Sequence, residues 1–158
     1  MNNNFKLIFL LFFLILGCNS KLTERVNILQ KIENLDMNIY SQDGNKIYTI
    51  KSPNSIYDQK NNIFILKKTT IYLFKDQKVK FVINSDSSKL SKNNKILELN
   101  GNVELNTFQE NNDILYADNF EWNIETSQYL LNGNVNFENK DIILISNKAI
   151  MNSNNLIE

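Results

Sequence analysis

The sequence predicts an all-β fold built from four copies of a two-strand unit, and three observations support this prediction. First, residues 97–105 recur in similar form as residues 129–137, with Gly101 and Gly133 separated by 32 positions. Second, beyond Asp36 apolar and polar residues alternate with period two in short runs rich in β-branched and aromatic residues. Third, polar turns separate these runs, at residues 61–62, 93–94 and 126–127. A repeat of this length is typical of a supersecondary unit stacked on its own copies.

Each copy is marked by a small residue that precedes a large apolar residue by five positions. These pairs are Ser52 and Tyr57, Ser85 and Leu90, Ala117 and Trp122, and Ser146 and Met151. The alternation predicts strands over residues 47–51, 63–67 and 69–75, and a half-buried strand over residues 78–84. Because one repeat cannot bury its apolar face alone, the units are expected to form one elongated stack.

The two Asn-Gly steps, at Gly101 and Gly133, have two interpretations. Asn-Gly between alternating runs is a strong hairpin signal. Each repeat already has a polar turn elsewhere, however, and a glycine inside a strand commonly marks a bend or bulge. We therefore predict that both glycines are kinks within longer strands, which would let the sheet curl over its apolar face.

Composition excludes several classes of function. The 158-residue chain has a formal net charge of zero and one arginine, Arg25, which leaves no basic surface for nucleic acid. It has no histidine, so it lacks the usual general base and metal ligand. Its one cysteine, Cys18, cannot form an intramolecular disulfide. The sequence therefore predicts no enzyme activity, no metal site and no cofactor.

Residues 1–17 have the layout of a signal peptide, in which one positive charge, Lys6, precedes an apolar run over residues 7–16. As a helix this run would rise about 15–20 Å, less than the ~30 Å hydrocarbon core of a bilayer. Residues 15–18 resemble the bacterial lipobox, whose cysteine is acylated and becomes the first residue of the mature lipoprotein. We predict that Cys18 is lipidated; the alternative is an uncleaved anchor with an unmodified cysteine.

Residues 18–37 are predicted to be the lipidated N-terminus and a tether, followed by the β-domain over residues 38–158. Leu22, Val26, Leu29 and Ile32 have helical spacing, which indicates a short helix or spacer. A partner-binding amphipathic helix is the alternative interpretation of this segment.

Two sequence motifs resemble the LptC/LptA/OstA family of lipopolysaccharide export proteins. One is the repeated Leu-x-Gly-x-Val pattern at residues 99–103 and 131–135, and the other is the strand over residues 116–123. The resemblance covers residues 48–152. It implies an open, V-shaped β-jellyroll whose apolar groove holds the acyl chains of lipopolysaccharide. It also implies edge strands that join jellyrolls head to tail into a periplasmic bridge.

Within that family, an anchored N-terminus followed by one jellyroll resembles LptC, the inner-membrane component. The implied partners are lipopolysaccharide, inner-membrane ABC transporter subunits and an LptA-like jellyroll. The expected location is the periplasm, where a lipid anchor would hold the protein at the inner membrane. The chain departs from the familiar LptC, which has a spanning helix. The alternatives are an LptA-like bridge subunit, a structural or surface β-repeat lipoprotein without a lipid ligand, and a hydrolase.

The resemblance and the alternation together predict two functional surfaces. The acyl-chain groove is expected to be lined by the inward-facing set Phe81, Ile83, Val103, Leu105, Trp122, Val135 and Phe137. The last alternating strand, predicted over residues 141–150, is expected to be an edge that pairs with the next jellyroll, because the fourth repeat ends before a further strand could cover it. Its contacts are assigned to Ile142, Ile143, Leu144, Ile145 and Ala149.

Overall fold

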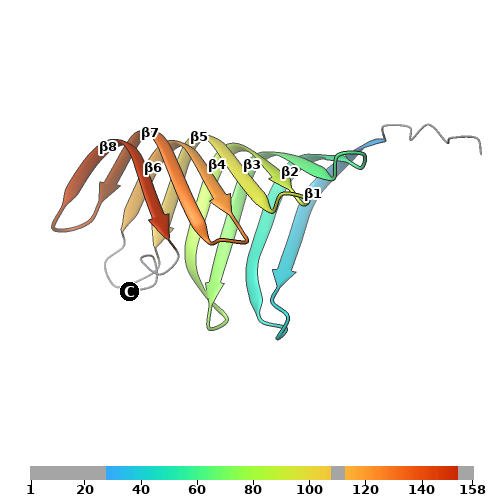
Figure 1. Cartoon of the computed structure of the whole chain (residues 1–158), viewed down its shortest axis with the longest axis horizontal. Helices are drawn as coiled ribbons and strands as arrows, with labels where there is room; N and C mark the ends of the chain where they lie inside the picture. The colour runs from blue at the N-terminus through green and yellow to red at the C-terminus, as the bar shows by residue number, and fades with distance from the viewer. Residues whose placement is uncertain (1–27, 108–112, 153–158) are drawn as a thin grey trace, which may run out of the picture.

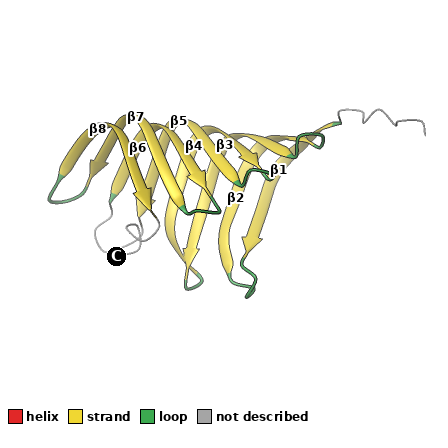
Figure 2. Cartoon of the chain, viewed as in Figure 1, coloured by secondary structure: helices red, strands yellow, loops and turns green. Residues whose placement is uncertain are grey.

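The computed structural model describes residues 28–107 and 113–152, which form one eight-stranded sheet (Figure 2). The strands are β1 (Leu29–Tyr40), β2 (Lys46–Asp58), β3 (Ile63–Lys75), β4 (Lys78–Ser91), β5 (Ile96–Thr107), β6 (Ile114–Asn123), β7 (Gln128–Glu138) and β8 (Ile143–Asn152). Neighbours along the chain pair antiparallel, and β1 and β8 each pair with one strand only. The predicted all-β fold with an open sheet is therefore confirmed.

Most strands are interrupted near their middle by an irregularity in the sheet. The pairing shifts register between Asn84 and Ser87 in β4, Asn100 and Val103 in β5, Tyr116 and Asn119 in β6, and Asn132 and Val135 in β7. Bulges bend a strand and increase its twist. Figure 1 shows the result, since the strands bend over one ridge and two arms of the sheet face each other below it.

Gly101 and Gly133 lie on this ridge with φ angles of 77° and 74°. Strands β5 and β7 continue through them, so neither Asn-Gly step forms a hairpin turn. Beside Gly101, Asn102 Nδ2 donates to Asp86 Oδ2 at 2.8 Å, and one repeat later Asn134 Nδ2 donates to Asp118 Oδ2 at 2.9 Å. The 32-residue repeat therefore preserves a polar contact across the bend as well as the glycine.

Gly101→Ala is expected to destabilise the fold more than Gly44→Ala does. Both glycines have a positive φ, which costs other residues about 1–3 kcal/mol. A Cβ at Gly101 would also lie 2.6 Å from Asp86 Oδ2, whereas a Cβ at Gly44 would meet nothing within 4 Å. Urea unfolding followed by circular dichroism measures the difference. Equal losses of unfolding free energy in the two variants would show that Asp86 does not hinder a side chain at position 101.

The polar turns between strands lie where the sequence predicts them, at residues 59–62, 92–95 and 124–127. Side-chain contacts join the turns of successive repeats, which lie side by side at the same ends of the strands. Asn62 Nδ2 donates to Asn93 Oδ1 at 2.9 Å, and Lys95 Nζ lies 2.8 Å from Glu125 Oε1. Each repeat is therefore aligned with the next by turn contacts in addition to the strand ladder.

Two expectations about local structure need correction. The helical spacing from Leu22 to Ile32 does not produce a helix from Leu29 onward, because β1 begins there and pairs with β2. The side chains of Leu35, Met37 and Ile39 on β1 are partly buried against the core. The sheet thus extends into the segment predicted as a tether, N-terminal to the expected boundary at residue 38. Residues 19–27 lie outside the described residues.

The second correction concerns β3, which is one strand rather than two strands over residues 63–67 and 69–75. Lys68, between the two predicted strands, has a φ of 50° and produces the bend without ending the pairing with β4. No glycine or proline marks this bend in the sequence.

Candidate functional site

The space between the two arms is filled by a single apolar cluster, and the predicted groove residues belong to it. Phe81, Ile83, Val103, Leu105, Trp122 and Val135 are buried, and Phe137 is half-buried at the edge of the cluster. All seven side chains lie on the inner face, since six of them belong to the apolar cluster and Phe137 packs against it. We call this region the cleft.

Aromatic rings meet inside the cleft, and one of their contacts joins strands that are not neighbours in the sheet. The rings of Tyr48 on β2 and Trp122 on β6 meet edge to face, with their centroids 5.1 Å apart. Trp122 also stacks on Tyr129 of β7 at 5.7 Å. Because Tyr48 and Trp122 lie on opposite arms, their contact holds the arms together. Alternation alone did not single out Tyr48 or Tyr129.

Buried hydroxyl groups line one part of the cleft, on strands β2 to β4. Thr69 Oγ1 and Ser88 Oγ lie 2.7 Å apart, and Ser52 Oγ donates to the backbone oxygen of Lys67 at 2.7 Å. The equivalent positions on β5 to β7 are apolar, since Val103 replaces Thr69 and Phe120 replaces Ser88 in the repeat. The cleft therefore has a polar part toward the N-terminus and an apolar part toward the C-terminus.

Two buried polar atoms in the cleft have no hydrogen-bond partner within the described structure, Ser55 Oγ and Trp122 Nε1. An unpaired buried polar group costs about 1–3 kcal/mol. A ligand that carries a hydroxyl, ester or amide group could satisfy these atoms if the arms separated. Neither residue was predicted for this role, although Trp122 was assigned to the groove.

Strand β8 lies at the edge of the sheet and differs from the predicted strand by its bounds, Ile143–Asn152 rather than 141–150. Large apolar residues are exposed along it, Ile143 66%, Leu144 50%, Ile145 78% and Ile150 68%, and Ile142, just before the strand, is 56% exposed. Ala149 is half-buried against the core. Among the described strands β8 pairs with β7 alone, so one side of its backbone is open to a further strand.

The free energy of unfolding is expected to fall above about pH 10, where tyrosine ionises in the unfolded chain. Burial raises the pKa of Tyr48 and of Tyr129 above the ordinary value of 10.0. Above that pH the unfolded state binds fewer protons than the folded state, so stability decreases as pH rises. Urea unfolding at several alkaline pH values measures the decline. The double variant Tyr48→Phe with Tyr129→Phe should show a shallower slope; an unchanged slope would contradict the assignment.

Neither a metal centre nor a membrane-spanning helix is found in the described part of the chain. No cluster of three or more His, Cys, Asp or Glu side chains there could hold a metal ion. No helix among the residues 28–107 and 113–152 is long and apolar enough to cross a membrane. Cys18, the predicted lipidation site, lies outside the described residues.

Comparison with known protein families identifies the chain. Residues 19–155 match the family model described as lipopolysaccharide-assembly, LptC-related. The chain belongs to this LptC-related family. The match confirms the resemblance seen in the sequence and extends it from residues 48–152 to nearly the whole chain. A search of curated proteins finds no significant match.

Membership of the LptC-related family places the chain in lipopolysaccharide transport and assembly, in the periplasmic part of the cell envelope. Members of the family are non-enzymatic transport components that interact with lipopolysaccharide and with the rest of the export machinery.

Proposed function

We propose that this LptC-related protein accepts the acyl chains of lipopolysaccharide in the cleft and passes them along a head-to-tail bridge of jellyrolls. In this proposal the protein is anchored at the inner membrane beside the ABC transporter subunits and delivers its cargo to an LptA-like jellyroll through β8. The observation that carries the proposal is the continuity of the apolar interior. It runs across β2 to β7 and reaches the inner side of β8, where Ala149 and Met151 pack against the core and Leu144 is 50% exposed.

The proposal requires the two arms to separate. The buried cleft residues are 0–9% exposed and fill the interior themselves, so an acyl chain must displace the Tyr48–Trp122 contact. Burial of an acyl chain contributes about 0.8 kcal/mol for each CH₂ group, which can offset the loss of one aromatic contact of about 0.5–1.5 kcal/mol. The unpaired Ser55 Oγ and Trp122 Nε1 also favour an occupied state, because polar groups near the acyl chains could pair with them.

Native mass spectrometry of the protein taken from a membrane fraction tests this function. We expect a peak that corresponds to the protein with one bound lipopolysaccharide or lipid A molecule, and we expect collisional activation to release that lipid. A chain recovered only without lipid, under conditions in which lipopolysaccharide is present in the same fraction, would contradict the proposal.

A structural role for the β-repeats is the second candidate function, and the filled cleft favours it. A structural repeat closes its core to native packing density, as the near-zero exposure of Ile83, Leu99 and Leu131 illustrates. Cysteines introduced at Tyr48 and Trp122 and joined by a reducible bifunctional crosslinker, which spans the space of the two removed rings, would lock the arms together. If the locked chain still takes up lipopolysaccharide as the reduced chain does, the cleft is not the lipid site and this second candidate is favoured.

The lipid anchor is tested at Cys18. We expect the wild-type chain to incorporate a fatty-acid label during growth and the Cys18→Ser variant to incorporate none, because only the thiol of Cys18 could carry the first acyl group. Attachment by two or three acyl chains would be stable, whereas one chain gives only reversible binding. Equal labelling of the two proteins, or no labelling of either, would mean that the chain is held at the membrane in another way.

A further inference from the structure

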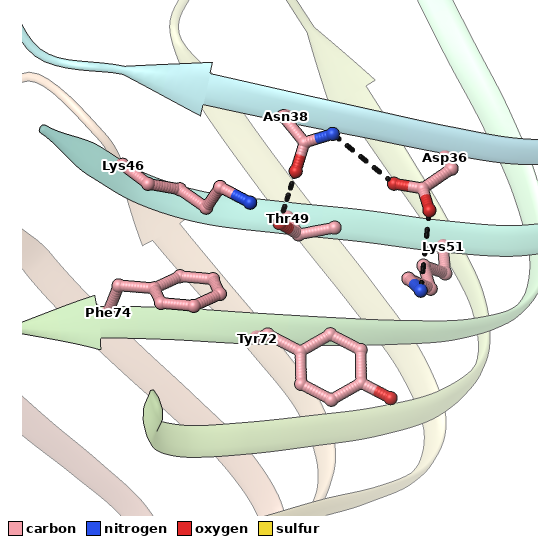
Figure 3. A pocket seen from close by; sticks show the side chains of 7 residues that line it. All are labelled: Asp36, Asn38, Lys46, Thr49, Lys51, Tyr72 and Phe74. Atoms are coloured by element: carbon pink, nitrogen blue, oxygen red, sulfur yellow. Dashed lines mark hydrogen bonds and ion pairs between the residues drawn. The ribbon is translucent and has the colours of Figure 1, made fainter. Parts of the chain in front are cut away.

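A polar hollow lies on the outer face of the sheet, on the side away from the cleft. It has a volume of about 310 Å³ and lies over β1, β2 and β3. The side chains that line it, shown in Figure 3, are Asp36, Asn38, Lys46, Thr49, Lys51, Tyr72 and Phe74. Thr49 pairs with Tyr72 in the sheet, beside the inward pair Ile50 and Ile71, so the hollow faces outward. None of these residues is part of the proposed cleft.

The lysines of the hollow are held in place by aromatic rings. Lys46 Nζ lies 5.2 Å from the centroid of the Phe74 ring and 5.9 Å from that of Tyr40. Lys51 Nζ lies 5.7 Å from the centroid of the Tyr72 ring and 3.3 Å from Asp36 Oδ2. Among the described residues, Lys46 forms no ion pair. Its charge is therefore positioned by cation–π attraction and remains available to an anion.

Hydrogen-bond donors and acceptors lie beside these charges in a fixed arrangement. Thr49 Oγ1 donates to Asn38 Oδ1 at 2.7 Å, and Asn38 Nδ2 donates to Asp36 Oδ1 at 3.5 Å. Thr49 is 5% exposed although it points out of the sheet, because its neighbours in the hollow cover it. The hollow thus combines two cations, one carboxylate, an amide and two aromatic rings within a volume typical of small-molecule sites, about 300–1,000 Å³.

A second hollow of about 590 Å³ continues from the first and shares Lys46 and Phe74 with it. It lies between the turn that follows β1 and the turn that follows β3, and it is lined by Asp43 and Asp76. Carboxylates accept hydrogen bonds from hydroxyl groups but repel anions. The extended surface therefore suits a molecule with one anionic end, at the lysines, and hydroxyl groups along the rest of its length.

We infer that this outer hollow binds an acidic saccharide, with its phosphate or carboxylate at Lys46 and Lys51. The ammonium groups attract the anion as point charges. The Asp36 carboxylate accepts hydrogen bonds from sugar hydroxyls, and the Asn38 amide donates to them. The rings of Tyr72 and Phe74 contact the apolar C–H edge of the sugar ring. A simple anion would make no contact with the Asp36 carboxylate or with the rings, and a neutral sugar would make no charge contact with the lysines. The inference does not depend on lipid binding in the cleft.

Titration of the ¹⁵N-labelled full chain in detergent micelles, followed by amide NMR signals, tests this site. The probes are glucose 6-phosphate, glucose, inorganic phosphate, and micelles that contain a phosphorylated glycolipid. We expect glucose 6-phosphate or the glycolipid to shift the signals of residues around the hollow. In the Lys46→Gln, Lys51→Gln double variant the Kd should rise about tenfold or more. Binding of the glycolipid alone would identify a lipid headgroup as the source, and binding of the free sugar phosphate would identify a soluble saccharide.

Matched controls separate a specific site from a general surface effect. Lys89 is an outward-facing lysine that, like Lys51, forms an ion pair, with its Nζ 3.6 Å from Glu98 Oε2. Lys89→Gln should therefore leave the Kd unchanged. Tyr72→Ala should weaken binding, whereas Tyr116→Ala, on the outer side of β6, should not. The inference is overturned if no probe shifts these signals, if the double variant binds as well as wild type, or if inorganic phosphate binds as tightly as the sugar phosphate.

Discussion

Replacing Val103 by aspartate is expected to unfold the protein, whereas the adjacent change Glu104→Lys should have little effect. Val103 is 1% exposed and pairs with Ala117 inside the cleft, where both belong to the apolar cluster. Burying an unpaired charge there should cost about 4 kcal/mol or more, a large share of the about 5–15 kcal/mol that stabilises an ordinary domain. Glu104 points to the outer face, where it lies beside its strand partner Tyr116 on β6.

Urea unfolding of the two variants followed by circular dichroism measures this difference directly. Similar losses would mean that the faces of β5 are exchanged, since a shift of one residue along a strand reverses its inner and outer sides. Phe137→Ser provides a folded comparison, because Phe137 is only half-buried. If the cleft binds acyl chains, this variant should keep its structure and lose lipopolysaccharide in the native mass spectrum.

The inner face of the sheet could be predicted from the sequence because side chains alternate strictly along a strand. Val103 and Leu105, and one repeat later Val135 and Phe137, occupy inward positions that period two alone assigns. The bends at Gly101 and Gly133 were also visible, since a glycine inside an alternating run commonly marks a bend or a bulge. The 32-residue repeat strengthened both assignments, because two copies gave the same pattern.

Whether the cleft is filled could not be predicted, because that depends on contacts between distant strands. The Tyr48–Trp122 contact joins β2 to β6 across the bend, and no local pattern specifies the angle between the two arms. The bend at Lys68 was missed for another reason, since lysine gives no signal for a positive φ. The helical spacing that ends at Ile32 was overridden by pairing with β2, as tertiary contacts often override local propensity.

The outer hollow was missed because its residues come from three strands and are ordinary surface types. Lys46 and Lys51 lie on β2, Tyr72 and Phe74 on β3, and Asp36 on β1. Only the antiparallel pairing of these strands brings the lysines over the rings. In the sequence, each residue is indistinguishable from a solvated lysine or an aromatic residue that favours strands.

Photo-crosslinkers at Leu144 and Ile145 are expected to capture an LptA-like jellyroll partner, and Ile145→Lys should reduce the capture about tenfold or more. Natural proteins normally protect an edge strand with charges, proline or a bulge, yet β8 exposes Ile143, Leu144 and Ile145 in succession. An incoming strand would pair with the free backbone of β8, and the apolar side chains would add to its affinity. A lysine at position 145 would place a charge in that interface and weaken the pairing.

Ile65→Lys is the matched control for this prediction, because Ile65 is 46% exposed but lies on β3, which is paired on both sides. A crosslinker at Asn54, on the interior strand β2, should likewise capture nothing. Circular dichroism of Ile145→Lys separates lost pairing from lost folding, since a residue that is 78% exposed contributes little to the core. If Ile145→Lys is folded and still captures the partner as wild type does, the bridge joins this protein at another surface, and the unpaired edge of β1 becomes the next one to test.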